Sequence, residues 1–160
     1  MKIQLTTAAI ALTLAGSTFG TFAADDFEFK SQIQARQAVM RLNSFNLGLL
    51  GAMAKGEAPY DAKVAAAAAN NLLAIANMDN AAMWPAGSGA DAPGLADKTR
   101  AKPEIWSTYP EITEKQQALT DALTTMAAAA GEGLDAVRAN MGAVGDGCKG
   151  CHESFRVPKD

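Results

Sequence analysis

The chain has few of the side chains that build metal sites or reactive centres, since its 160 residues include only two cysteines and one histidine. A structural zinc site uses four Cys or His ligands, so zinc is a poor fit. No apolar run is long enough to span a membrane. Lys2 is the only charge in the first 23 residues, which leaves 13 basic against 17 acidic residues beyond them. This acidic balance makes nucleic acid an unexpected partner.

Strict alternation of polar and apolar residues is also missing, and β-branched residues are sparse. Apolar side chains instead recur at helical spacing, which predicts an all-α fold in one domain. Two short connections and one long one, over residues 86–102, favour an antiparallel four-helix bundle. The predicted helical segments are residues 27–54, 62–78, 103–107 with a main body over 111–130, and a last helix over 134–155.

Two packing details follow from the same spacing. The run of alanines from Ala65 to Ala69 predicts a close approach between two helices, because small side chains allow it. In the first helix, a second apolar stripe runs through Leu42, Phe45, Leu49 and Met53, so we expect neighbours on two sides of that helix.

The two cysteines and the histidine stand together as Cys148-Lys149-Gly150-Cys151-His152. Two thiols at this spacing can bind the vinyl groups of a haem, and the histidine that follows is then a proximal iron ligand. A thiol-disulfide oxidoreductase would carry Cys-x-x-Cys after a strand, and no strand pattern is nearby. A structural disulfide would have poor geometry within a helix. The motif therefore predicts one covalently bound haem c.

The N-terminus is typical of an export signal. Met1-Lys2 precedes an apolar run from Ile3 to Leu14, and small residues follow as far as Ala23. This pattern predicts a cleaved signal peptide over residues 1–23 and a mature domain over 24–160. Export of a chain that carries covalent haem predicts a periplasmic location, with no membrane span in the mature chain.

Both cysteines fall on the apolar seam of the last helix, so the haem is expected to face the interior of the bundle. The first helix runs antiparallel to the last, which brings Arg36, Gln37 and Met40 toward the haem. The Met40 thioether could bind the iron opposite His152, as soft ligands do in many electron-transfer cytochromes. It could equally fill the distal pocket as an apolar side chain without bonding. The spacing alone leaves both readings open. The seam residues are Leu134, Val137, Met141, Val144, Cys148, Cys151 and Phe155.

Four segments together resemble the class II cytochromes c, the family of cytochrome c′ and its low-spin relatives. They are Ala35-Arg36-Gln37 with Met40, Lys55 to Asp61, Ala101 to Trp106, and Cys-x-x-Cys-His followed by Phe155-Arg156. The resemblance implies a four-helix bundle with haem on Cys148 and Cys151 and with His152 as the proximal ligand.

The resemblance also implies further roles near the haem. Arg36 and Gln37 are expected near the haem propionates, with Thr99 and Arg100 close to the same edge. The segments from Met83 to Gly89 and from Thr99 to Pro103 resemble the methionine-ligated branch, which favours Met40 as the distal ligand. Homodimers occur among such relatives, so a homodimer is one expected assembly.

The predicted function is electron transfer by a monohaem cytochrome that exchanges electrons with redox partner proteins. The alternative is a five-coordinate, high-spin cytochrome c′ that binds NO or CO at an open distal face. A redox enzyme such as a peroxidase would need a distal acid-base residue, and the only histidine is already assigned to iron. No catalytic residues and no enzymatic activity are therefore predicted.

Overall fold

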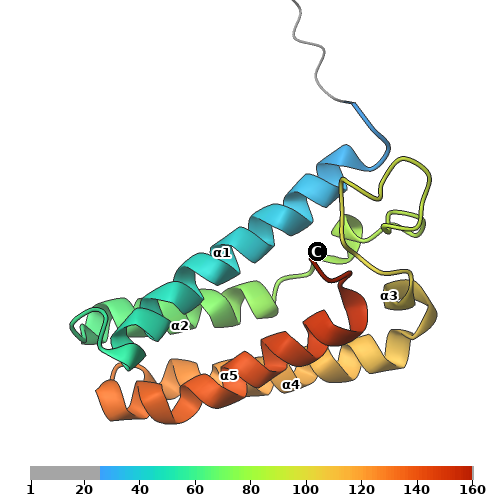
Figure 1. Ribbon diagram of the computed structural model, residues 1–160. Coiled ribbons are helices and arrows are strands. Elements are labelled where there is room, and N and C mark those ends of the chain that lie inside the picture. The colour runs from blue at the N-terminus through green and yellow to red at the C-terminus, as the bar shows by residue number, and fades with distance from the viewer. Residues whose placement is uncertain (1–25, 160) are drawn as a thin grey trace, which may run out of the picture.

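The computed structural model describes residues 26–159, and within that range the chain is helical, with one isolated antiparallel bridge between Ala101 and Arg156. Two short pieces, the 3₁₀ turn η1 (Ala81–Met83) and α3 (Glu104–Ser107), lie along the connection between the second and third long helices. The predicted all-α class and antiparallel four-helix bundle are confirmed (Figure 1). The long helices are α1 (Lys30–Lys55), α2 (Ala62–Ala76), α4 (Tyr109–Ala129) and α5 (Leu134–Phe155).

The four long helices form a ring in which α1 packs beside α2, α2 beside α4, α4 beside α5, and α5 beside α1. Short connections enforce this order: Gly56 ends α1 in a left-handed conformation with φ 78°, and Asp61 caps α2 by accepting two backbone hydrogen bonds. Figure 1 shows α1 and α5 close together at one end of the bundle and diverging toward the other. The C-terminal residues and the long connection lie at the diverging end.

Two helix starts differ from the predicted ones. Phe29 has a left-handed backbone with φ 58°, so α1 begins at Lys30 and not at residue 27. Pro110 was expected to precede the main body of its helix, but α4 already begins at Tyr109. Proline is tolerated in a first helical turn, because the N–H that it lacks would have no intrahelical partner there.

The main hydrophobic cluster joins all four long helices at the end where α1 and α5 meet. The predicted close packing of the alanine run is confirmed, since Ala65, Ala68 and Ala69 are fully buried. The predicted second stripe of α1 is half right: Met53 is buried and Leu49 packs against this cluster. Leu42 and Phe45 are 53% and 64% exposed, so the first half of the stripe is not a packing face within residues 26–159. The buried members are Leu50, Met53, Ala65, Ala68, Ala69, Leu72, Leu123, Met126, Ala130, Val137 and Val144.

A second, smaller cluster lies at the diverging end. Ala101, Ile105 and Phe155 form its buried part, so it joins the long connection and α3 to the end of α5. Two tryptophans, Trp84 and Trp106, pack against it. Among residues 26–159, none of the helices combines the length and apolar character that crossing a bilayer requires.

Candidate haem-binding site

Cys148 and Cys151 lie on α5 with free, half-buried thiols. Burial raises the pKa of Cys148. Burial also raises the pKa of Cys151, where the Lys115 cation opposes the effect and Cys148 adds to it. Thiol-disulfide oxidoreductases need the opposite, a thiolate with a lowered pKa. Within the described residues, no three His, Cys, Asp or Glu side chains gather as a metal cluster. The pair is therefore suited to covalent attachment of a cofactor.

His152 follows directly and is also half-buried. Its pKa is lowered, first by burial and then by the positive charges of Arg156 and Arg100. A neutral imidazole keeps a nitrogen lone pair, which is what an iron ligand requires. Arg156 and His152 also line a hollow of about 560 Å³, together with Lys149, Glu153 and Pro158.

The register between α1 and α5 sets His152 level with Met40. A Cβ built on Gly51 would lie 4.0 Å from Cε of Met141, and Arg138 Nε donates a 2.8 Å hydrogen bond to the carbonyl of Ala54. Every residue of an α-helix advances the same distance along the helix axis. In two antiparallel helices, a residue a given number of positions before a contact on one helix is therefore level with the residue the same number of positions after that contact on the other. Met40 stands eleven residues before Gly51, and His152 stands eleven after Met141.

At this level the apolar seams of both helices are uncovered. Met40 is 44% exposed, although Ile33 and Leu50 on the same helix are buried. On α5, Cys148, Cys151 and His152 are half-buried, and they stand between Val144 and Phe155, which are both buried. On α5 the main cluster ends at Val144, and Cys151 packs against the second cluster. A haem needs apolar walls, two thiols and an axial ligand, so the residues present fit this cofactor.

Arg36 is buried, with only 4% of its surface exposed. Its guanidinium donates hydrogen bonds to the carbonyl of Met83 at 3.1 Å, to Oγ and the carbonyl of Ser88 at 2.7 and 2.9 Å, and to Thr99 Oγ1 at 3.4 Å. It also lies 4.6 Å from the ring centroid of Trp84. Burial lowers the pKa of Arg36, yet an arginine stays charged. No carboxylate within residues 26–159 pairs with it, so the site holds a buried cation that suits an anionic group such as a haem propionate.

The other predicted edge residues fall in two places. Gln37 donates a 2.8 Å hydrogen bond to the carbonyl of Lys98, and Thr99 accepts from Arg36 and from the backbone N–H of Ala101. Arg100 lies on the other side, where it donates to the carbonyl of Val157 at 3.4 Å and acts on His152 through its charge.

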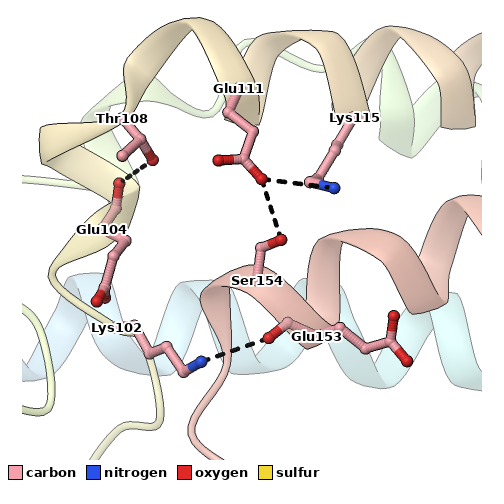
Figure 2. A network of polar contacts seen from close by, with 7 residues as sticks. All are labelled: Lys102, Glu104, Thr108, Glu111, Lys115, Glu153 and Ser154. Atoms are coloured by element: carbon pink, nitrogen blue, oxygen red, sulfur yellow. Dashed lines mark hydrogen bonds and ion pairs between the residues drawn. The ribbon is translucent and has the colours of Figure 1, made fainter.

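Polar contacts hold the end of α5 just beyond His152 (Figure 2). Ser154 donates a 3.1 Å hydrogen bond to Glu111, which also pairs with Lys115 at 3.5 Å. Lys102 donates to the carbonyl of Glu153 at 3.3 Å. The helix turn that carries His152 is therefore tied to α4 and to the long connection.

Sequence reasoning named Thr99 beside Arg36 but missed two other residues that bind the guanidinium. Ser88 is fully buried between Arg36 and the carbonyl of Pro85, and Trp84 supplies the ring under the guanidinium. The Trp-Pro-Ala-Gly-Ser-Gly stretch marks an unusual loop in the sequence. This loop contacts α1 only because the connection between α2 and α4 folds back onto that helix. The spacing of residues in the sequence does not show that path.

Comparison with known proteins gives a consistent set of relatives. The sequence profile described as Cytochrome C′ matches residues 31–156. The chain is 37% identical to cytochrome c-554 of Cereibacter sphaeroides over 148 residues, which covers 92% of this chain and 95% of the relative. The crystal structure of cytochrome c′ from Thermochromatium tepidum is 34% identical and superposes with a TM-score of 0.72, covering 83% of this chain and 99% of that one.

Some solved relatives carry bound gases. Variants of cytochrome c prime from Alcaligenes xylosoxidans have been solved with NO and with carbon monoxide, and each is 32% identical to this chain. Their TM-scores are 0.70 and 0.69, over 84% and 83% of this chain and all of theirs. Another relative, 31% identical over 83% of this chain and 99% of its own with a TM-score of 0.71, shows ligand-controlled dimer dissociation.

Proposed function

The chain belongs to the cytochrome c′ family, the class II cytochromes c, whose members bind a single covalent haem c, and we propose that it is a periplasmic monohaem carrier of electrons. In this proposal Cys148 and Cys151 hold the haem through thioether bonds, and His152 is the proximal ligand. Met40 is the distal ligand. The observation that carries the proposal is that Met40 and His152 stand level on antiparallel helices, where Met40 is exposed and His152 is only half-buried.

The bound haem supplies a centre that gains and loses one electron. His152 reaches such a centre as a neutral donor, because burial and two nearby cations lower its pKa. A methionine thioether as the second ligand raises the reduction potential of a histidine-ligated haem. The apolar side chains of α1 and α5 would keep water from the iron, and the contacts of Ser154 and Glu153 hold the helix turn that carries His152 in place.

The polar edge of the site would hold the propionates. Arg36 is a buried cation without a carboxylate partner among the described residues. Four of its five N–H groups already bind Met83, Ser88 and Thr99, so its charge and its Nε–H are what it offers a propionate. Gln37 and Thr99 stand beside it, and Arg100 adds a cation near His152. These contacts support Arg36, Gln37 and Thr99 as one propionate edge, whereas Arg100 lies on the other side, near His152.

In this proposal the protein exchanges electrons with redox partner proteins. It reaches the periplasm through the predicted signal peptide over residues 1–23. The leader lies outside the described residues. Relatives include one with ligand-controlled dimer dissociation, which supports a homodimer as the assembly for this chain too.

A second candidate function is the binding of NO or CO by a five-coordinate haem, with Met40 packed over the iron without bonding. The gas complexes of the relatives from Alcaligenes xylosoxidans favour this candidate. The two functions differ in one respect, which is whether the sixth position of the iron is filled.

Optical spectra of the purified protein separate the two functions. Ligation by Met40 predicts a six-coordinate, low-spin haem with a weak methionine-to-iron band in the near infrared when oxidised. Met40→Ala should remove that band, and Met78→Ala should keep it, since Met78 is similarly exposed (39%) but follows the end of α2. A high-spin spectrum in both redox states, unchanged in Met40→Ala, would favour gas binding.

A further inference from the structure

The connection over residues 83–102, called the strap below, is fastened to α1 at one side. Arg36 donates four hydrogen bonds to three of its residues, and Gln37 donates one more to the carbonyl of Lys98. Ser88 lies at the centre of this contact. It is fully buried, and its hydroxyl also donates a 2.7 Å hydrogen bond to the carbonyl of Pro85. The strap is thus held to the turn of α1 that precedes Met40.

The middle of the strap is folded tightly on itself and on α3. Trp106 Nε1 donates a 3.0 Å hydrogen bond to the carbonyl of Trp84, and the two rings lie 6.4 Å apart. The N–H of Ala90 donates to the carbonyl of Ala101 at 2.8 Å. A Cβ on Gly89 would lie 3.0 Å from Trp106 Cζ3 and 3.3 Å from that same carbonyl, so the backbone is packed without spare room. Such a segment can transmit a displacement from one end to the other.

The other side of the strap is fastened to the end of α5. The N–H of Lys102 donates to the carbonyl of Phe155 at 3.0 Å, and the N–H of Val157 donates to the carbonyl of Arg100 at 2.8 Å. These bonds make the bridge between Ala101 and Arg156. Figure 2 adds the contact of the Lys102 ammonium with the carbonyl of Glu153, the residue after His152.

The strap therefore joins the helix that carries Met40 to the helix that carries His152, at the end of the bundle where α1 and α5 diverge (Figure 1). The exposure of Met40 means that α5 does not itself cover α1 at this level. We propose that Arg36 is a positioning residue for the iron site, which acts through the strap to fix the spacing of α1 and α5 and hence the approach of Met40 to the iron. This role is additional to any contact with a propionate, and its effect on Met40 rests on the proposed function.

Two variants of the holoprotein test the coupling. Arg36→Lys keeps a cation that can still attract a propionate, but an ammonium cannot reproduce the fork that binds Met83, Ser88 and Thr99 together. Ser88→Ala leaves Arg36 in place and removes only the strap hydroxyl. Ser107→Ala is the matched control, because Ser107 is exposed on α3 and its hydroxyl has no hydrogen bond within the described residues.

The first readout is hydrogen exchange at the N–H groups of Lys102 and Val157, which lie on the α5 side of the strap. Both variants should raise these rates by about tenfold, the effect of losing one charge-assisted hydrogen bond, and Ser107→Ala should not. This readout does not depend on what binds the iron. Unchanged exchange in both variants would overturn the coupling.

The second readout is the iron itself. CO must displace Met40 to bind, so a loosened α1 should weaken the near-infrared band and raise CO affinity by about tenfold. Val157→Pro removes the hydrogen bond from the N–H of Val157 to the carbonyl of Arg100, on the α5 side of the strap, and should also weaken the band and raise CO affinity. The double variant with Arg36→Lys should raise CO affinity by less than the product of the two single effects, because both changes act through the strap. Faster exchange with an unchanged spectrum and unchanged CO affinity would overturn the positioning role. If the wild-type protein itself lacks the methionine band, Met40 is not an iron ligand and its proposed positioning is refuted. The exchange rates would still show whether Arg36 holds the strap to the end of α5.

Discussion

Arg36 donates hydrogen bonds to both the hydroxyl and the carbonyl oxygen of Ser88, at 2.7 and 2.9 Å, although the two residues are 52 positions apart in the chain. Two bonds from one guanidinium to one residue fix its orientation as well as its distance. The ring of Trp84 packs against the face of the Arg36 guanidinium. A helix residue thus specifies the path of a segment that has little regular structure of its own.

Covalent attachment predicts that haem stays with the polypeptide through acid-acetone extraction. The double variant Cys148→Ala/Cys151→Ala has no thiol left, so any haem that it binds should enter the organic phase. The measurement is the absorbance of the two phases. If the wild-type haem is extracted, the assignment of both cysteines is wrong.

Gly147→Ala should destabilise the protein relative to Gly145→Ala. A Cβ on Gly147 would lie 3.1 Å from Cα of Leu119, so α4 and α5 would have to separate, whereas a Cβ on Gly145 meets nothing within 4 Å. Both changes gain the same helix propensity, which cancels in the comparison. The difference in free energy of unfolding should be about 1–3 kcal/mol, the usual cost of overpacking, measured by urea denaturation of the holoprotein. Equal stability of the two variants would mean that the helices adjust without cost.

Asp61→Ala should lower the free energy of unfolding by about 0.5–2 kcal/mol, because it removes the N-cap of α2. The Asp61 carboxylate accepts from the N–H groups of Lys63 and Val64 at 2.9 and 3.0 Å. Asp61→Asn keeps an acceptor oxygen and is the control. A loss of the same size in Asp61→Asn would point to the charge and not to the cap.

The leader prediction is tested by the intact mass of the protein from its native host. The mass should correspond to a chain that begins close to Ala24 and carries one haem. A haem-bearing chain that still begins at Met1 would contradict export by a cleaved signal.

The bundle could be predicted because its helices carry apolar residues at helical spacing and short connections force antiparallel neighbours. The same reasoning predicted that Met40 lies toward the Cys148–His152 segment, since only the order and direction of two helices were needed. It could not say which helix faces stay uncovered. Leu42 and Phe45 have the spacing of a packed stripe, yet burial depends on whether another helix reaches them.

The site residues divide in the same way. Cys148, Cys151 and His152 are recognisable from adjacent positions, because their chemistry requires that spacing. The partners of Arg36 come from a segment about fifty residues away, and no periodicity connects them. The resemblance to a family brought Arg36 to attention through the propionates, whereas its contacts with Ser88 and Trp84 became visible only in three dimensions.

The separation of the two hydrophobic clusters bears on how the cell assembles this protein. The main cluster contains no residue of the Cys148–His152 segment, and its buried side chains already contact one another across all four long helices. That half of the bundle does not need the cofactor to form its contacts, so it can fold before any haem arrives. The cysteines stay at the diverging end, half-buried and unpaired, where the enzymes that join haem to thiols can reach them. Maturation can then begin with a partly folded chain and finish when the haem fills the level between the clusters.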